Sequence, residues 1–468
     1  MEDNQTLSFS AAKLFAGEAN VRDRSGLDAR LAAQFVEQNE ANFAKLNCRW
    51  ERDFDGAEVR LIVHTQNTVG AVPLLSPRSG KYDFGLTVLP RFSWASLGGL
   101  LGEMGWRVAP SPLRLPLLPR STRRVPKWVI SSMVLARLDA LVKQAERRFE
   151  STCEELRAPR GSVDWTTYAQ ASLPRARFLA LPCRFPDLKR DQHLAGAIRF
   201  TLQAHRDALE SQRAQGAFAL QLLRWCEELL ALVSFAAPLR PTATLLEQWK
   251  RSSLRSPAFR EGIESIAWTV DDRNLAGTSD LEGLPWALPM DAFFEAWLEA
   301  VAEWIGKQSG GHMQAGRKRE THHALDWVPA LPGAQRALIP DLWLQWSQTT
   351  LILDAKYKRH WEDMADFRGP SREDLFREQH RQDLLQALAY SSLTRSKRVI
   401  TCLAYPCHLN LWHSLLQRNR LIHRAHVGPV GEGGRQTEIW LTALPLAGPI
   451  PEVALPLLEL LREEQVAA

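Results

Sequence analysis

Two acidic residues and a lysine stand at spacings that suit the hydrolysis of phosphodiester bonds. Asp341 opens one apolar run, and Asp354 and Lys356 end a second apolar run after a short polar turn. Because side chains alternate between faces along a strand, Asp354 and Lys356 are predicted to point the same way. Two carboxylates suit Mg²⁺ or Mn²⁺, which binds few protein ligands together with waters and substrate phosphate. The lysine can hold the attacking water or offset the negative charge that develops on phosphorus.

The two apolar runs, residues 341–346 and 350–353, are rich in β-prone side chains and predict an antiparallel hairpin. Such a hairpin would bring Asp341 close to the end of the strand that carries Asp354. The alternative is an exposed hairpin in which Asp354 and Lys356 face solvent. The run 350–353 is typical of a buried strand, and an acid at its end favours a functional role. We therefore predict that Asp341, Asp354 and Lys356 form a catalytic group with the two acids as metal ligands.

Two predicted helices could complete this group. Gln386 and Tyr390 stand four residues apart in a helical pattern over 383–390 and therefore share a face. They are predicted to point at the metal or the scissile phosphate, although Gln386 could also belong to a polar stripe on a surface helix. Glu295 lies in an apolar helical pattern over 291–305. It either completes the metal site or forms an internal ion pair, and the sequence leaves both open.

The chain of 468 residues is too long for one compact core, and three regions differ in texture. Residues 1–150 are predicted to form a β-rich domain, which ends in an irregular basic run and a helical pattern. Residues 151–285 are predicted to be helical, and residues 286–468 contain the candidate site. The fold class is thus a mixed α/β multidomain protein. The expected elements are strands at 61–63, 86–89 and 437–445, helices at 129–150, 194–209 and 217–235, and loops at 110–126 and 306–321.

The composition, 45% hydrophobic and 24% charged, is that of an ordinary globular protein without an apolar run that could span a membrane. The start of the chain is acidic and polar, unlike a signal peptide. Six scattered cysteines lack the spacing of a metal site and indicate free thiols in the cytoplasm. Most of the 17 tryptophans stand among apolar residues and are expected in the core. The sequence contains no P-loop, so nucleotide hydrolysis by that route is not expected.

The net charge of +5 is compatible with phosphate contacts but does not demonstrate them. One basic cluster comprises Arg120, Arg123, Arg124 and Lys127, and another comprises Arg317, Lys318 and Arg319. On charge alone, a solvated surface is favoured over a nucleic-acid patch for both.

The order of these motifs resembles the PD-(D/E)xK nuclease superfamily: Pro-Asp, a spacer, Asp-x-Lys, then Gln-x-x-x-Tyr on a helix. More narrowly, residues 354–358, the pair Gln386 and Tyr390, and residues 404–406 are similar to the McrC family. That family supplies the nuclease subunit of McrBC-type modification-dependent restriction systems. The resemblance is specific across about 290–445 and fainter upstream.

The resemblance implies that residues 286–468 form a restriction-endonuclease-like domain that cuts DNA with Mg²⁺ or Mn²⁺. It also implies a separate McrB-like AAA+ motor that hydrolyses GTP or ATP, engaged by residues 1–150 and connected through the helical region 151–285. Two alternatives remain: a stand-alone DNA repair or recombination nuclease, and an activator subunit of an AAA+ motor that does not itself cut DNA.

Overall fold

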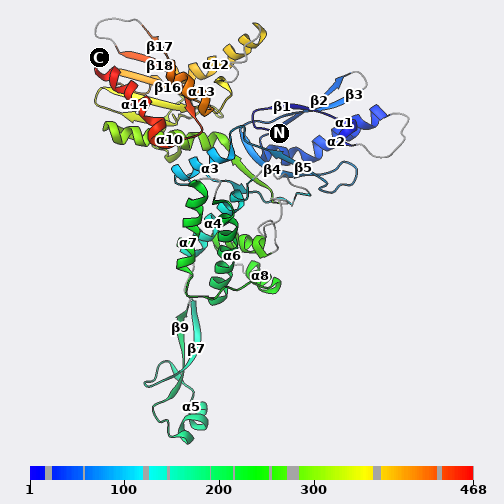
Figure 1. The fold of residues 1–468 in the computed structure, drawn as a ribbon, viewed down its shortest axis with the longest axis vertical. Coiled ribbons are helices and arrows are strands. Elements are labelled where there is room, and N and C mark those ends of the chain that lie inside the picture. The colour runs from blue at the N-terminus through cyan, green and yellow to red at the C-terminus, as the bar shows by residue number, and fades with distance from the viewer. Residues whose placement is uncertain are drawn as a thin grey trace. The chain divides into compact units, whose positions relative to one another are not determined.

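A computed structural model describes residues 1–15, 24–55, 58–116, 118–119, 126–144, 148–189, 191–213, 217–251, 256–270, 284–361, 370–428 and 435–466. The chain divides into two compact units. Unit 1 comprises residues 1–126, 215–218 and 280–468, and unit 2 comprises residues 127–214 and 219–279. Both contain helices and strands (Figure 1). The mixed α/β class is therefore confirmed, whereas the domain borders near 150 and 285 stay predictions.

A six-stranded sheet carries the candidate site in unit 1. Its order is β11 (His312–Ala315), β14 (Leu342–Gln345), β15 (Thr349–Ala355), β16 (Arg398–Cys407), β18 (Gln436–Pro445) and β17 (Ile422–Val427). The predicted hairpin is confirmed as β14 and β15, and the strand predicted at 437–445 is β18. Strands β15, β16 and β18 run parallel to one another. Strand β16 is buried along its whole length, as parallel strands covered on both faces usually are.

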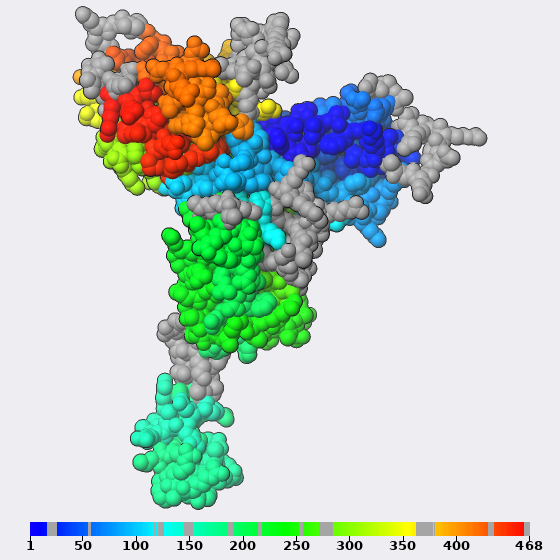
Figure 2. Space-filling model, in the orientation of Figure 1, coloured from blue at the N-terminus to red at the C-terminus, as the bar shows by residue number. Residues whose placement is uncertain are grey.

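Helices cover this sheet and connect its strands. Helix α12 (Pro370–Ser391) is the crossover between the parallel strands β15 and β16. Ile352 of β15 packs in one cluster with Tyr390 of α12, so its neighbours in the strand point to the other face. Helix α10 (Met290–Ser309) contacts β15 there (Figure 1). Helices α13 (Leu409–Gln417) and α14 (Ile450–Val466) are seen in orange and red on one face of unit 1 (Figure 2).

Two small antiparallel sheets form the N-terminal part of unit 1. The first has the order β1 (Thr6–Ser10), β3 (Glu58–His64) and β2 (Arg49–Asp55), with α1 (Ala11–Leu14) and α2 (Arg24–Lys45) against it. The second has the order β5 (Phe84–Val88), β4 (Thr68–Leu74), β10 (Trp286–Pro289) and β6 (Ser111–Pro112), and α3 (Trp94–Glu103) follows β5 in sequence. The strands predicted at 61–63 and 86–89 are confirmed as β3 and β5.

Strand β10 connects the N-terminal sheet to the part of unit 1 that carries the candidate site. It lies between β4 and β6 and leads directly into α10. The contact with β4 depends on Gly70, where a Cβ atom would lie 2.2 Å from the carbonyl oxygen of Trp286. A side chain at this position would force the two strands apart. The close approach therefore explains why glycine occupies a strand interior.

Unit 2 has a core of packed helices: α4 (Trp128–Lys143), α6 (Gln192–Glu210), most of α7 (Ala217–Leu232), α8 (Ala243–Lys250) and α9 (Pro257–Val270). The helices predicted at 194–209 and 217–235 are confirmed as α6 and α7, the latter ending three residues early. The middle region also contains strands that the helical patterns did not predict. A ribbon of β7 (Arg148–Leu156), β9 (Leu181–Lys189) and β8 (Ser162–Val163) interrupts the helices, so the helix predicted over 129–150 ends at Lys143. The short elements α5 (Trp165–Thr167), η1 (Tyr168–Ser172) and η2 (Leu173–Arg175) follow β8 in sequence.

Several smaller expectations can be compared with the structure. The loop predicted over 306–321 is wrong, because α10 continues to Ser309, Gly310 ends it at a φ of 69°, and β11 follows. Arg120, Arg123 and Arg124 lie outside the described residues. The six cysteines are free thiols. None of the helices in the described part of the chain has the length and hydropathy that a transmembrane helix needs.

Candidate active site

The hairpin of β14 and β15 brings three of the predicted residues together. Asp341 stands immediately before β14, and the register Leu342 to Leu353 carries it opposite Asp354. The backbone N–H of Ala355 donates a hydrogen bond to Asp341 Oδ2 at 2.7 Å. The Nζ of Lys356 lies 2.6 Å from Asp354 Oδ2, so these two side chains share a face as predicted. The backbone N–H of Lys356 donates to the carbonyl of Ala404 on β16, which holds the lysine at the end of the parallel ladder.

Asp354 is buried, Asp341 is half-buried beside it, and this disfavours their charged forms. Burial, followed by the charge of Asp354, raises the pKa of Asp341 to about 8. Burial also raises the pKa of Asp354, although the ammonium group of Lys356 opposes the shift. These surroundings therefore disfavour two negative charges in the site, and a bound cation would offset them.

A chain of hydrogen bonds fixes the position of the lysine. The Nζ of Lys356 donates to Gln386 Oε1 at 2.7 Å, and Gln386 Nε2 donates to the hydroxyl of Tyr390 at 2.7 Å. Tyr390 in turn donates to the carbonyl of Ile339, two residues before Asp341, at 3.2 Å. Burial raises the pKa of Tyr390 to about 12, so its hydroxyl stays a donor at neutral pH. The structure thus gives Gln386 a contact with the lysine rather than a place on a surface stripe, and it gives Tyr390 a contact with Gln386.

A further buried acid lies on α12, and no motif in the sequence marked it. Asp383 is buried, and both its oxygens lie 2.8 Å from the Nζ of Lys358, while Tyr405 donates to its Oδ2 at 2.9 Å. His360 stacks on the Tyr405 ring at 4.1 Å. The only sequence signal was position: Asp383 precedes Gln386 by three residues, and Lys358 follows Lys356 by two. Asp383 therefore supports the segment after Lys356 from the same helix that holds the lysine itself.

Glu295 lies on α10 near the two acids. Burial raises the pKa of Glu295, whereas the guanidinium group of Arg317 lowers it. The charge of Glu295 is close enough to contribute to the raised pKa of Asp341. Within the described residues, however, no three His, Cys, Asp or Glu side chains form a group that could hold a metal ion. The role of Glu295 as a third ligand stays a prediction.

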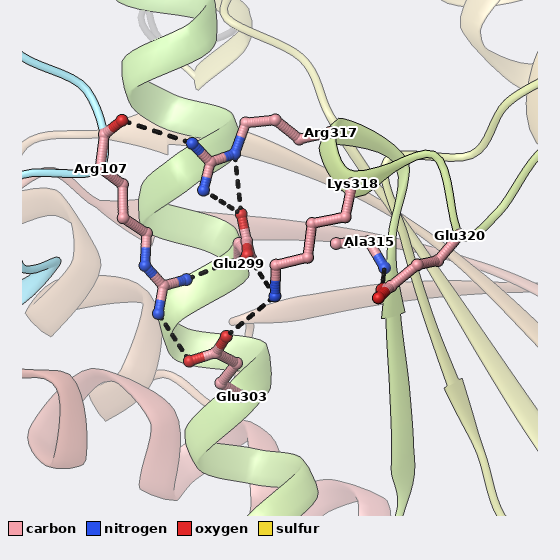
Figure 3. A network of polar contacts seen from close by, with 7 residues as sticks. All are labelled: Arg107, Glu299, Glu303, Ala315, Arg317, Lys318 and Glu320. Atoms are coloured by element: carbon pink, nitrogen blue, oxygen red, sulfur yellow. Dashed lines mark hydrogen bonds and ion pairs between the residues drawn. The ribbon is translucent and has the colours of Figure 1, made fainter.

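The next turns of α10 carry a network of ion pairs (Figure 3). Glu299 is 1% exposed and lies 3.2 Å from Arg107, 2.9 Å from Arg317 and 3.3 Å from Lys318. Glu303 pairs with Arg107 at 2.6 Å. Two members of the basic cluster at 317–319 are therefore paired with acids, and the expectation of a solvated surface rather than a nucleic-acid patch stays a prediction. The network also ties α10 to the turn η4 (Gly316–Lys318), whose Gly316 N–H donates to the carbonyl of Asp341 at 2.7 Å.

The start of the chain supports the other side of the hairpin. The hydroxyl of Tyr357, next to Lys356, donates to Asp3 Oδ2 at 2.6 Å. Arg91 lies 3.9 Å from Asp3 and donates to the carbonyl of Lys358 at 3.1 Å. Burial raises the pKa of Asp3, and the neighbouring Arg91 opposes the shift. N-terminal residues thus contact the backbone that follows the catalytic lysine.

The donor set fits a hard divalent cation. Asp354 offers a buried carboxylate and Asp341 a half-buried one, and Asp354 Oδ2 has no hydrogen bond of normal geometry despite its closeness to Lys356. Mg²⁺ and Mn²⁺ use one or two carboxylates and complete their shell with waters and phosphate. A separate open pocket beside α13, β17 and α14 has Glu459 as its only lining acid and lacks such a pair.

The sequence matches the family described as McrBC 5-methylcytosine restriction system component over residues 63–406, and the chain belongs to this family. The resemblance to McrC is confirmed. A half-complex of the tetradecameric assembly of Thermococcus gammatolerans McrB AAA+ hexamers with bound McrC is similar at 13% identity, covering 95% of this chain and 94% of that chain with a TM-score of 0.39. The cryo-EM structure of the Thermococcus gammatolerans McrBC complex is similar at 16% identity, covering 65% and 87% with a TM-score of 0.27. No curated protein sequence matches this chain. Family membership rests on the sequence match alone.

Proposed function

We propose that this chain is the metal-dependent DNA endonuclease subunit of an McrBC-like restriction system, cutting phosphodiester bonds when coupled to an AAA+ motor. The observation that carries the proposal is the convergence of Asp341, Asp354 and Lys356, with Gln386 on the lysine. The neighbouring acids support a metal-binding site over a scaffold, because their desolvation and mutual repulsion disfavour both charges unless a cation is bound. Membership of the restriction-system family supports DNA as the substrate.

Asp341 and Asp354 would hold Mg²⁺ or Mn²⁺, with Glu295 as a further candidate ligand. The bound ion would polarise the phosphodiester and lower the pKa of a bound water. Lys356 would orient the attacking water and stabilise the negative charge that develops on phosphorus. Gln386 would hold the ammonium group in place, and Tyr390 would hold the amide of Gln386. Burial keeps the distances between these groups fixed, which favours a preorganised site.

Cleavage by variants of the catalytic lysine and acid tests the proposal. Lys356→Ala and Asp354→Asn should lower the rate of Mg²⁺-dependent DNA cleavage by at least about 100-fold, because each removes a group aimed at developing charge. The assay needs the full chain together with the AAA+ protein encoded nearest to it. Lys143→Ala is the matched control, since this lysine is 69% exposed and lies in unit 2. Full cleavage by either site variant, with circular dichroism unchanged, would refute the assignment.

The motor partner is proposed because the chain belongs to the McrBC family and contains no P-loop. Residues 1–150 are the region expected to engage this partner. Phe54 on β2 is an exposed apolar side chain in that region. A larger exposed apolar group lies beyond that region, at Trp165, Phe178 and Leu179. Substituting Phe54 alone, or these three together, with serine would show which surface stimulates the partner's GTP or ATP hydrolysis. Stimulation that survives both sets of substitutions would argue against both surfaces.

The two alternative functions make different predictions in the same assay. A stand-alone repair or recombination nuclease would cut DNA at its full rate without the AAA+ protein. An activator subunit that does not cut DNA would stimulate nucleotide hydrolysis equally well as wild type and as Lys356→Ala, with no cleavage by either. The acid pair favours the nuclease over the activator.

A further inference from the structure

Exposed apolar side chains gather in a loop that lies 10 to 14 residues before Asp341 in the sequence. Strands β12 (His323–Ala324) and β13 (Ala337–Leu338) form a small hairpin whose loop runs over residues 325–336. In this loop Val328 is 94% exposed, Leu331 is 56% exposed and Trp327 is 48% exposed. Single exposed apolar residues are ordinary, but three within five positions at one tip form a patch.

The base of this hairpin is anchored, so the tip is not a free loop. The N–H of Leu325 donates to the carbonyl of Arg336 at 2.8 Å, and Trp327 Nε1 donates to the carbonyl of Gln335 at 2.7 Å. Leu338 packs against the core cluster that contains Tyr390 and Ile352. The hairpin therefore rests on the side chains that also lie under the catalytic site.

The segment between the hairpin and the site is short and held at both ends. Tyr390 donates to the carbonyl of Ile339, and Thr321 donates to the carbonyl of Pro340 at 2.6 Å. Asp341 follows directly. A molecule that contacts the tip is consequently placed in a fixed relation to the acid that would bind the metal.

The polar residues around the tip suit a nucleic acid. Arg319, His322 and Arg336 are exposed on or beside the hairpin, together with the acids Glu320 and Asp326. Cations that flank an apolar wedge are the combination by which proteins hold phosphates while inserting side chains between base steps. A protein partner fits less well, because a stable interface buries about 800 Å² on each side and three side chains supply only a part of that.

We propose that Trp327, Val328 and Leu331 insert against the bases of DNA held at the catalytic site and partly unstack the base step beside the scissile phosphate. This inference rests on the proposed nuclease function. An unstacked step makes the backbone easier to bend toward the metal-binding acids, and it gives the enzyme a preference for deformable base steps at the cut.

Base-stacking fluorescence on the complete system tests the proposal. Duplexes carry 2-aminopurine at successive positions around the mapped cut, and Lys356→Ala in the full chain, with its AAA+ partner and Mg²⁺, keeps the DNA intact. We expect the fluorescence to rise at the step beside the cut. Adding Val328→Asp and Leu331→Ser should abolish this rise, whereas adding Leu455→Ser, at an apolar residue on α14 that is 45% exposed, should leave it unchanged.

The same tip substitutions are then made with Lys356 intact. They should slow cleavage at least tenfold while stimulation of the partner's nucleotide hydrolysis and the melting temperature stay unchanged, and Trp327→Ala should act in the same direction. Unchanged fluorescence and cleavage would overturn the proposal. Loss of motor binding or a changed oligomeric state would also overturn it and assign the tip to a protein contact. If the wild-type chain with its partner cuts no DNA at all, the nuclease function fails instead.

Discussion

Gln386 is the residue whose role can be worked out most directly from the structure. Its Oε1 accepts from the Nζ of Lys356 at 2.7 Å, while the same lysine keeps a contact of 2.6 Å with Asp354. Gln386→Met preserves the length and helix preference of the side chain but removes the acceptor. A hydrogen bond to a charged group contributes about 1.5–3 kcal/mol. If that contribution is expressed in the transition state, cleavage slows by about 10- to 150-fold.

Tyr390 provides an internal check on this reasoning. Tyr390→Phe removes two hydrogen bonds between uncharged groups, and each contributes about 0.5–1.5 kcal/mol, so a loss of about 2- to 13-fold is expected if only the bond to Gln386 matters for the rate. If Tyr390 acts through Gln386, the double variant should be no slower than Gln386→Met alone. Independent effects would multiply instead.

The assay is single-turnover DNA cleavage by the full chain with its AAA+ partner at saturating Mg²⁺. Leu385→Met is the matched control, because it places the same side chain at an exposed neighbouring position of α12. The melting temperatures of the wild-type protein and of the four variants separate a loss of catalysis from a loss of folding. Cleavage by Gln386→Met at the wild-type rate, or multiplying losses in the double variant, would refute the proposed chain from Tyr390 to the lysine.

Three further predictions concern stability. His205 is buried between Ser131 and Thr269, and burial lowers its pKa to about 3. Its pKa is thus lower when folded than when unfolded, so stability should fall as the pH drops below about 6.5, by up to about 1.4 kcal/mol per pH unit. Urea unfolding at pH 7 and pH 5 should show a smaller loss for His205→Gln than for wild type. Gly70→Ala should lower the free energy of unfolding by about 1–3 kcal/mol, because the added Cβ meets the Trp286 carbonyl; an unchanged value would contradict the close packing of β4 and β10. Glu299→Gln should lower the free energy of unfolding by about 1–3 kcal/mol, a range reduced because the cationic partners of Glu299 are partly exposed to solvent. A gain in melting temperature would contradict this expectation.

The catalytic hairpin could be predicted from sequence because its determinants are local. Two β-prone runs around a polar turn define β14 and β15, and the two-residue period sets Asp354 and Lys356 on one face. The helical period likewise places Gln386 and Tyr390 together. Each of these inferences needs only neighbours in the chain.

The partners of these residues could not be predicted, since they come from distant segments. Asp383 contacts Lys358 in the segment after β15 and Tyr405 of β16. Glu299 contacts Arg107 in the N-terminal part of unit 1. Long-range pairs leave no periodic trace in a single sequence. The site was therefore predictable as a list of residues but not as a network.

Two missed elements show how strands can escape periodicity. Strand β11 lies at the sheet edge, and its four residues include no run of apolar side chains, because pairing with β14 stabilises it through the backbone. The ribbon of β7 and β9 holds itself together by cross-strand pairing, and Pro182 and Pro186 weaken any strand signal in β9. In both cases pairing with a neighbouring strand, rather than a run of apolar residues, defines the strand.

The charge state of the site connects its stability to its proposed activity. The pKa of Asp341 is raised to about 8 when folded, above its usual value of about 3.8, so folding is favoured at low pH and loses this contribution as the pH rises toward 8. The rest of unit 1 therefore holds the charged forms of the two acids in surroundings that destabilise the fold. Asp3 and Arg91 hold one flank of the hairpin, and the network around Glu299 holds the other. A ligand that binds only the folded site stabilises it in proportion to its affinity. A divalent cation bound at the acid pair would thus offset the loss of stability that the two carboxylates cause. The hairpin would become more rigid as the metal binds.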